Sequence, residues 1–525
     1  GRATAFVNVN ELDPEGNWEA EPAESEDYKT RIVVYRPIDQ ADFNGTVLME
    51  WLNVTAGFET PPSWGTGHLE MRRSGSVWVG VSAQFVGIEG SPNGLLPLHL
   101  KAAEPERYQS LLHPGDSFSY DMFSQAAQAV RNPSGIDPLD GLDVERIIAY
   151  GESQSAGRLT TYVNAIHPLF NAFDGYMIHS RGSGSSPLAQ EPQAGILTPQ
   201  ASRVRTDLNV PVMTFATETE VVFLGFVNAR QPDTDRIRTW EVAGTAHGDY
   251  YTFVTGRDDR VGDPVFAAVV EEKSVLGFIT CERPMNNGPH HYVFNRAVRA
   301  LNEWVETGTP PAVSPRLEVN DDLSDYLYDD LGNAVGGIRT PYVDAPSAIL
   351  RGEPNSGAGF CRLFGTTSLF SPAQMASLYV DQQGFVEAVT EAANDAVAAG
   401  FLLPEDAELT TTFRGLDLGG VQVIQGRGEA LRRADDGESL VGEPQAFTAI
   451  PYYAWAHRGR TEMRVWLAQE ESATLPLARP TLASTATVTA SFTDRSDAGA
   501  VNDQLEPKSS IDHDVPVYHW WPHQD

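Results

Sequence analysis

Positive charge is scarce in this chain of 525 residues. It has 37 lysines and arginines against 71 aspartates and glutamates, which sets the formal net charge at −34. The only lysines are Lys29, Lys101, Lys273 and Lys508. A nucleic-acid-binding protein needs a basic surface, and an anionic membrane surface repels so acidic a chain. We therefore expect no nucleic-acid partner, no membrane insertion, and a surface that its charge keeps soluble.

Cysteine is nearly absent, because Cys281 and Cys361 are the only two. Two thiols do not form a metal site by themselves, and neither lies near the candidate site described below. They favour one structural disulfide in an exported protein. Two unpaired thiols in a cytosolic protein are the alternative.

Long apolar runs are absent as well. No stretch approaches the ~18 residues of a membrane span, and no secretory signal peptide is recognisable. The numbering begins at Gly1, which is compatible with a processed or a truncated N-terminus. Taking this together with the expected disulfide, we expect an extracellular or periplasmic protein whose signal peptide has been removed. The length predicts more than one domain, and 41% hydrophobic residues can fill a large core.

The most informative stretch is residues 147–166, IIAYGESQSAGRLTTYVNAI. An apolar run predicts a buried strand, and the apolar residues after Ser155 recur at helical spacing. Ser153 lies between them, with small residues two positions before and two positions after it. This strand–turn–helix pattern is typical of the nucleophile elbow of α/β-hydrolases. Gly151 and Ser155 are small enough for the backbones to pass closely at such a strained turn.

Two alternatives to a nucleophilic Ser153 remain open at this point. Ser153 could be an ordinary helix N-cap. Ser155 could instead be the nucleophile of a pattern shifted by two residues. We prefer Ser153, because Gly151 then directly follows the strand and the N–H group of Gln154 can stabilise an oxyanion.

The surrounding sequence predicts a doubly wound α/β sheet. Further strands are expected at residues 30–35, 46–52, 76–82, 175–180, 211–216 and 237–242, and helices at 117–131 and 292–305. Residues 86–114 read as a long loop, and residues 181–209 read as a lid or cap insertion.

Ligands bind at the carboxyl ends of the strands in such a sheet. A small-residue loop, residues 53–57, follows the strand at 46–52. The second oxyanion-hole N–H group of α/β-hydrolases comes from an early loop of this kind. We therefore expect the oxyanion hole to be formed by the N–H groups of Gln154 and Val54, although residues 53–57 could also be an ordinary connecting loop.

A serine hydroxyl needs a base, and the base needs an orienting carboxylate. In α/β-hydrolases these groups follow the serine in the order acid, then histidine. Glu220 lies in the loop after the strand at 211–216, and His247 lies in the loop after the strand at 237–242. We expect a catalytic triad of Ser153, His247 and Glu220, with Glu218 as the alternative acid.

Other polar residues near these positions receive different interpretations. Glu152 is expected to orient the site or to lie at the surface. His179 precedes the acid in the chain, so it reads as a supporting or structural residue. His290 and His291 come just before the helix expected at 292–305 and should pack or cap.

Several motifs resemble bacterial proteins of the "alpha/beta hydrolase domain" family over residues 1–405. They are WLNV from Trp51, GESQS from Gly151, AGTAH from Ala243, LNEWVETGTPP from Leu301, and GNAVGGIRTP from Gly332. The resemblance implies the α/β-hydrolase fold and a Ser-acid-His triad on Ser153, Glu220 and His247. Glu220 stands where the family pattern has aspartate. The resemblance also implies a Cys281–Cys361 disulfide, since similar positions often carry cysteine.

The last stretch differs in composition. Residues 406–525 are expected to form a β-sandwich domain, because short alternating runs are separated by turns. IPYYAWAHRG from Ile450 and EMRVW from Glu462 resemble the C-terminal β-domain of β-L-arabinofuranosidase-type glycoside hydrolases. The tail is similar to the start of a discoidin-like sandwich and stops early, so this domain is expected to be truncated. The catalytic region of that glycosidase has no counterpart here.

These features predict a secreted serine carboxylesterase. Acylated glycans are a candidate substrate only because the C-terminal stretch resembles a domain of glycoside hydrolases. A glycan-binding scaffold with an inert hydrolase domain is the alternative from another class. Peptidase or lactonase activity on the same triad also stays open. No metal-ligand cluster or cofactor motif is recognisable, so none is expected, and the sequence does not predict the oligomeric state.

Overall fold

The computed structural model describes residues 1–92, 94, 96–255, 259, 262, 264–275, 279–415, 424–433 and 440–449. The chain divides into two compact units, Gly1–Leu416 and Asp417–Asp525. The boundary expected at residue 405 falls within helix α12 (Pro404–Gly415), which belongs to the first unit. The assignment of the two parts as a catalytic and an accessory domain stays a prediction.

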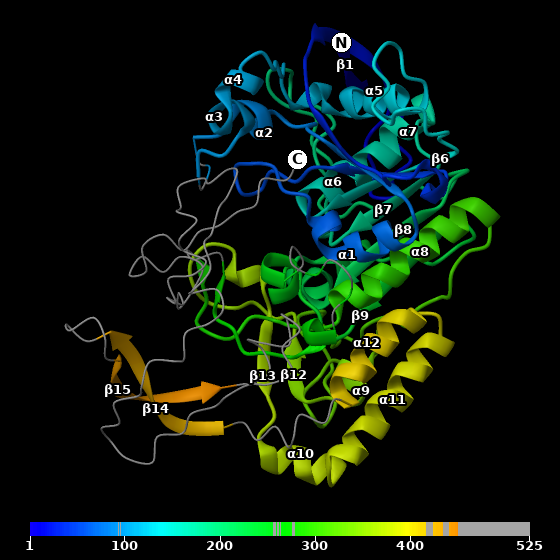
Figure 1. Ribbon diagram of the computed structural model, residues 1–525. Helices are drawn as coiled ribbons and strands as arrows, with labels where there is room; N and C mark the ends of the chain where they lie inside the picture. Colours follow the sequence, from blue (N-terminus) through cyan, green and yellow to red (C-terminus); the bar gives the residue numbers. More distant parts are fainter. Residues whose placement is uncertain are drawn as a thin grey trace. The chain divides into compact units, whose positions relative to one another are not determined.

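A seven-stranded sheet forms the centre of the first unit (Figure 1). Its order is β3-β5-β4-β6-β7-β8-β9, and every neighbouring pair is parallel except β3 and β5. The strands are β3 (Ile32–Tyr35), β4 (Thr46–Trp51), β5 (Val77–Val81), β6 (Arg146–Glu152), β7 (Gly175–His179), β8 (Val212–Thr217) and β9 (Ile237–Val242). The mostly parallel, doubly wound sheet predicted from the sequence is therefore confirmed.

Both faces of this sheet are covered by helices, which explains why the side chains of β4, β5 and β7 are buried along the whole length of each strand. Successive side chains of β4 point to opposite faces. Val47 and Met49 pack in a core with α5 and α6, whereas Leu48 packs in a second core with α8. Figure 1 shows α5 and α6 on one side of the sheet and α1 and α8 on the other.

The helices of the first unit, besides α12, have the following bounds. They are α1 (Pro62–Arg73), α2 (Phe85–Glu89), α3 (Leu100–Ala103), α4 (Pro105–Tyr108), α5 (Ser119–Arg131), α6 (Gln154–Thr161), α7 (His167–Phe170), α8 (His290–Thr307), α9 (Pro341–Asp344), α10 (Pro372–Tyr379) and α11 (Gln382–Ala398). The prediction of a loop at residues 86–114 is thus wrong in part. Two helices of one turn each, α3 and α4, begin there at Leu100 and Pro105.

Short 3-10 and π-helical segments complete the helical structure. They are η1 (Gln40–Asp42), η2 (Asp116–Phe118), η3 (Tyr162–Ile166), η4 (Thr219–Phe223), η5 (Phe226–Ala229), η6 (Tyr251–Thr255), η7 (Pro264–Ala267) and η8 (Cys361–Leu363). Among the described residues, no helix combines the length and the apolar character needed to cross a membrane.

Within the described part of the chain, four pairs of strands lie outside the central sheet. Within the first unit these antiparallel pairs are β1 (Arg2–Asn8) with β2 (Ala20–Asp27), β10 (Ser274–Val275) with β11 (Ile279–Thr280), and β12 (Ala348–Arg351) with β13 (Thr366–Leu369). In the second unit β14 (Ile424–Arg433) pairs antiparallel with β15 (Leu440–Ala449). The rest of the expected β-sandwich lies outside the described residues.

Residues 181–209, between β7 and β8, contain no helix. Their backbone includes a bridge between Ala189 and Ile196. Leu188 and Val204 are buried in the same core as α5 and α6. The segment is therefore part of the core on that face, and a role as a lid stays a prediction.

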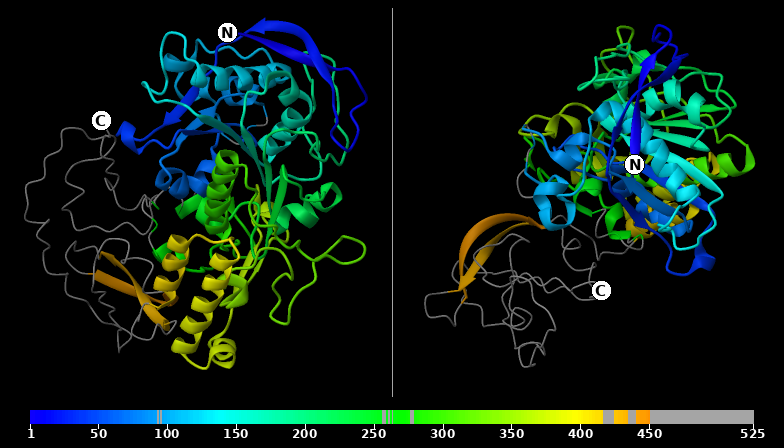
Figure 2. Two further views of the ribbon diagram at one scale, coloured as in Figure 1. Left: turned by 90° about the vertical axis from the view of Figure 1, so that its right-hand side faces the viewer. Right: turned by 90° about the horizontal axis from the view of Figure 1, so that it is seen from above.

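The chain after β9 returns to the sheet and surrounds its last edge. Ile338 forms a parallel bridge with Val242, at the end of β9. Cys281 and Cys361 form a disulfide across 80 positions of the chain. Helices α11 and α12 lie side by side in this part of the unit (Figures 1 and 2). The disulfide implied by the family resemblance is present in the structure.

Candidate active site

Ser153 lies at the sharp turn between β6 and α6. Its backbone has φ 58° and ψ −117°, a strained conformation for a residue with a Cβ atom. A Cβ atom on Gly151 would lie 2.7 Å from the carbonyl oxygen of Ser155, so only glycine fits there. The N–H group of Ser153 donates to the carbonyl oxygen of His179 at 2.9 Å, which ties the turn to β7.

The structure brings Ser153, Glu220 and His247 together from the C-terminal ends of β6, β8 and β9. His247 Nε2 lies 2.8 Å from Ser153 Oγ, and His247 Nδ1 lies 2.6 Å from Glu220 Oε1. His247 follows β9, and Glu220 lies in η4 after β8. One imidazole therefore connects a hydroxyl group to a carboxylate, which is the arrangement that activates a serine.

Glu220 is fully buried and held as an anion. Its Oε2 accepts hydrogen bonds from the Thr217 N–H group and the Thr217 hydroxyl, each at 2.6 Å. Burial alone would raise the pKa of Glu220, but the hydrogen bonds from His247 and Thr217 hold it below its usual value. A charged carboxylate at this position keeps the Nδ1 proton on His247 and leaves Nε2 facing the serine.

Glu218, the alternative acid, does not reach His247. Its Oε1 accepts from the Gly244 N–H group at 2.6 Å, and its Oε2 accepts from the Gly352 N–H group at 2.8 Å. Burial raises the pKa of Glu218 to about 7. This carboxyl group therefore joins the loop after β8 to the loop after β9 and to the chain near Gly352.

Glu152 is buried, so the expectation that it could lie at the surface is wrong. It is 7% exposed, and its Oε1 lies 3.3 Å from His247 Nε2. Burial raises the pKa of Glu152 above its usual value. The sequence of β6 indicates this burial, because every second side chain of a strand points to the same face. Glu152 therefore shares a face with the apolar residues Ile148 and Tyr150.

Asn53 connects the loop after β4 to the elbow. Its side-chain amide donates to the carbonyl oxygen of Glu152 at 3.0 Å and to Glu152 Oε2 at 3.2 Å. The backbone of Asn53 pairs with Thr60, which closes the loop that contains Val54. Gln154 is the first residue of α6, where a backbone N–H group has no acceptor within the helix. An oxyanion hole formed by Gln154 and Val54 stays a prediction.

Two buried histidines lie behind the candidate triad. His179 Nε2 lies 2.8 Å from His290 Nε2, and His179 Nδ1 lies 3.5 Å from Ser63 Oγ. Burial lowers the pKa of both imidazoles. They therefore form a neutral pair that supports the C-terminal end of β7. His291 stacks on Tyr251 with ring centroids 3.5 Å apart, and Pro289, not a histidine, occupies the N-cap of α8.

Ser155, the other candidate nucleophile, is fully buried in the first turn of α6. Its carbonyl oxygen packs against Gly151, as expected for the small residue of the elbow. Among the described residues, no group of three or more His, Cys, Asp or Glu side chains is placed to hold a metal ion.

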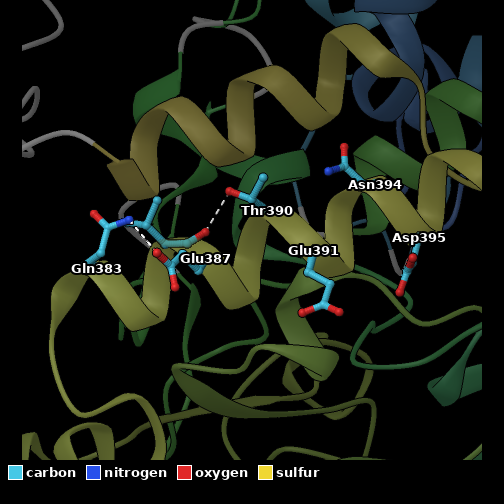
Figure 3. A pocket seen from close by; sticks show the side chains of 7 residues that line it. Gln383, Glu387, Thr390, Glu391, Asn394 and Asp395 are labelled. Atoms are coloured by element: carbon cyan, nitrogen blue, oxygen red, sulfur yellow. Dashed lines mark hydrogen bonds between the residues drawn. The ribbon is translucent and has the colours of Figure 1, made fainter.

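A hollow on the first unit lies along α11 (Figure 3). All of its lining residues come from this single helix, and no residue at a strand end contributes. Its polar members are Gln383, Glu387, Thr390, Glu391, Asn394 and Asp395. The hollow is therefore separate from the side chains that meet at Ser153.

The chain after residue 280 supports the loops that carry His247 and Glu220. Asn286 Nδ2 donates to the carbonyl oxygen of Gly244 at 3.1 Å. Thr219 Oγ1 accepts from the His247 N–H group at 3.1 Å and donates to the carbonyl oxygen of Gly352 at 2.8 Å. These contacts position the histidine and the acid from a distant part of the sequence.

The family model described as "Alpha/beta hydrolase domain" matches residues 1–412. The chain belongs to this family. The family resemblance seen in the motifs is thereby confirmed, and the protein is a hydrolase of the α/β class by membership. A search among curated proteins found no match to this hydrolase.

Two solved structures show a weak likeness to this hydrolase. An α/β serine hydrolase without a lid, from Xanthomonas campestris, is 10% identical, with a TM-score of 0.25 over 47% of this chain and 86% of its own. A prolyl endopeptidase is 14% identical, with a TM-score of 0.24 over 42% of this chain and 37% of its own. At these TM-scores neither likeness bears on the substrate of this hydrolase.

Proposed function

We propose that this protein is a serine carboxylic ester hydrolase that works through an acyl-enzyme. The observation that carries the proposal is the position of His247, 2.8 Å from Ser153 Oγ and 2.6 Å from Glu220 Oε1. Three groups from three separate strand ends meet with the contacts that nucleophilic catalysis needs.

In the first half of the reaction Ser153 Oγ attacks the ester carbonyl while its proton passes to His247 Nε2. Glu220 stabilises the imidazolium that forms. The tetrahedral oxyanion lies at the N-terminal end of α6, where the Gln154 N–H group and the Val54 N–H group are the proposed donors. Each such donor contributes about 2.7–4 kcal/mol to the transition state.

The first half ends when His247 gives its proton to the leaving alcohol, which departs and leaves an ester on Ser153. A water molecule then gives a proton to His247 Nε2 and attacks the acyl carbon. Collapse of this second tetrahedral species releases the carboxylic acid and returns the proton to Ser153. No group outside this chain and water is needed to balance the reaction.

The substitution Ser153→Ala tests the proposal. The hydrolysis of p-nitrophenyl acetate should fall about 10⁶-fold, and a fluorophosphonate probe should label the wild-type protein and not the variant. Ser155→Ala is the matched control, since Ser155 is a buried serine two residues further on, in the first turn of α6, and its loss should keep both activities. Wild-type rates in Ser153→Ala would overturn the proposal.

The substrate class needs a separate experiment, because the triad does not select the leaving group. Short-chain and long-chain acyl esters, acetylated xylan, lactones and a proline-containing peptide should be compared by kcat/KM. The proposal expects the esters to be cleaved fastest. Binding to glycans without fluorophosphonate labelling would instead favour an inert scaffold.

The Cys281–Cys361 disulfide supports an exported protein.

A further inference from the structure

The imidazole of His247 lies between two buried carboxyl groups. Glu220 occupies its Nδ1 side, as the proposed triad requires. On the Nε2 side, Glu152 Oε1 lies at 3.3 Å and Ser153 Oγ lies at 2.8 Å. A ring nitrogen has either one proton or one lone pair to offer. Glu152 and Ser153 therefore compete for the same position on His247.

The surroundings of Glu152 contain little positive charge to hold it as an anion. Its Oε2 accepts from the neutral amide of Asn53, at 3.2 Å. Among the ion pairs of the described residues, His247 is its one cationic partner. Glu50 from β4 and Glu220 from η4 both face it and oppose its ionisation.

The groups that face His247 from the other elements do not reverse this balance. His290 from α8 and His179 from β7 lie nearby, and burial lowers the pKa of both, so they are neutral. The charge of Asp249 acts on His290 and opposes the lowering of its pKa by burial. Burial would lower the pKa of His247, but Glu152 and Glu220 raise it above its usual value.

We propose that Glu152 and His247 Nε2 hold one proton between them in the resting enzyme, and that its release to solvent makes His247 available as a base. With the proton on His247, Nε2 has no lone pair for the serine. With the proton on Glu152, its O–H group occupies that lone pair. After release, Nε2 can accept the Ser153 proton, and the Glu152 anion stabilises the imidazolium. The inference rests on the proposed ester hydrolysis and deepens it.

The pH dependence of kcat/KM for p-nitrophenyl acetate tests the shared proton. In the wild type, activity should rise with pH in the alkaline range, because the base is free only after deprotonation. In Glu152→Gln this rise should move to lower pH by about 1–2 units, since one anion near His247 is lost. The variant should then be faster than the wild type at neutral pH and slower at high pH.

Asp121→Asn is the matched control. Asp121 is a buried carboxyl group on α5 that accepts from the Thr4 N–H group at 2.7 Å, and burial raises its pKa. Its substitution should leave the pH profile where it is. An unchanged profile in Glu152→Gln, with activity that still depends on Ser153, would overturn the shared proton and leave the proposed hydrolysis intact.

A second measurement is independent of catalysis. The titration of His247 can be followed by NMR with ¹³C-labelled histidine in Ser153→Ala, and its signal can be assigned by its absence in His247→Asn. The midpoint should fall by about 1–2 pH units when Glu152→Gln is added. Equal midpoints in the single and double variants would overturn the inference, and this result holds even if the protein proves not to be an esterase.

Discussion

Glu218 and Glu220 are two residues apart and both fully buried, yet only Glu220 contacts His247. The carboxyl oxygens of Glu218 instead accept from the backbone N–H groups of Gly244 and Gly352. Two acidic residues of one short loop therefore have different tasks. Glu220 orients the imidazole, and Glu218 holds the loops on which the imidazole depends.

Substituting the two acids separates these tasks. Glu220→Gln should lower kcat/KM for p-nitrophenyl acetate about 10³–10⁴-fold, because the imidazolium loses its compensating charge. Glu218→Gln should stay within about tenfold of wild type, a change of about 1.4 kcal/mol in the barrier. Steady-state kinetics at one alkaline pH measure both losses of kcat/KM. A larger loss in Glu218→Gln than in Glu220→Gln would make Glu218 the acid.

The stability of the protein should depend on pH through Glu218. Burial raises its pKa to about 7 from 4.5, so the folded state binds this proton more tightly than the unfolded state. The stabilisation is fully present below about pH 4.5 and is lost as the pH rises through 7. The free energy of unfolding in urea should therefore fall between pH 5 and pH 8, and Glu218→Gln should reduce this fall by about 1–3 kcal/mol.

The exposed residue Glu391 provides the control for that measurement. Glu391→Gln should show the same difference between pH 5 and pH 8 as the wild type. If Glu218→Gln behaves like Glu391→Gln, the buried carboxyl group does not take up its proton in this range.

An added methyl group should be tolerated at Gly157 in α6 and not at Gly151 before the elbow. Gly151→Ala places its Cβ atom 2.7 Å from the backbone oxygen of Ser155, so it should cost about 1–3 kcal/mol of stability and most of the activity. In α6, the Cβ atom of Gly157→Ala would lie 3.2 Å from the flexible hydroxyl of Ser186 and no closer than 3.5 Å to backbone atoms. Thermal unfolding and p-nitrophenyl acetate hydrolysis should show a large loss for the first variant and a small change for the second.

The disulfide should protect the histidine loop from thermal inactivation. Cys281 and Cys361 close a long loop, and Leu363 beside it accepts a hydrogen bond from the Gly248 N–H group at 3.2 Å. The double substitution of both cysteines by serine should lower the free energy of unfolding by about 2–4 kcal/mol. Dithiothreitol should shorten the half-life of activity at elevated temperature in the wild type. It should not do so in the double variant.

Much of the sheet could be predicted from local pattern. Its strands are short apolar runs bounded by turns, and in a parallel sheet their carboxyl ends meet at one edge. For this reason the approach of Ser153, His247 and Glu220 could be anticipated from their order along the chain. The role of each side chain in catalysis stays a prediction until the variants are measured.

The remaining parts of the site could not be predicted from local patterns in the sequence. The position of Glu152 beside Ser153 suggests an orienting or a surface role, whereas alternation along β6 places it on the buried face with Tyr150. Asn53, His290 and Gly352 act through contacts with residues about a hundred positions away, as with the 99 positions between Asn53 and Glu152. Such contacts depend on how loops pack, and a local pattern carries no information about them.

The support that Gly352 gives to Glu218 spans 134 positions of the chain. Every proposed catalytic side chain has left the ribosome long before this segment is synthesised. A nascent polypeptide that ends before Gly352 holds Ser153, Glu220 and His247 but lacks the backbone that fixes the acid loop. Hydrolytic competence should therefore arise late in translation.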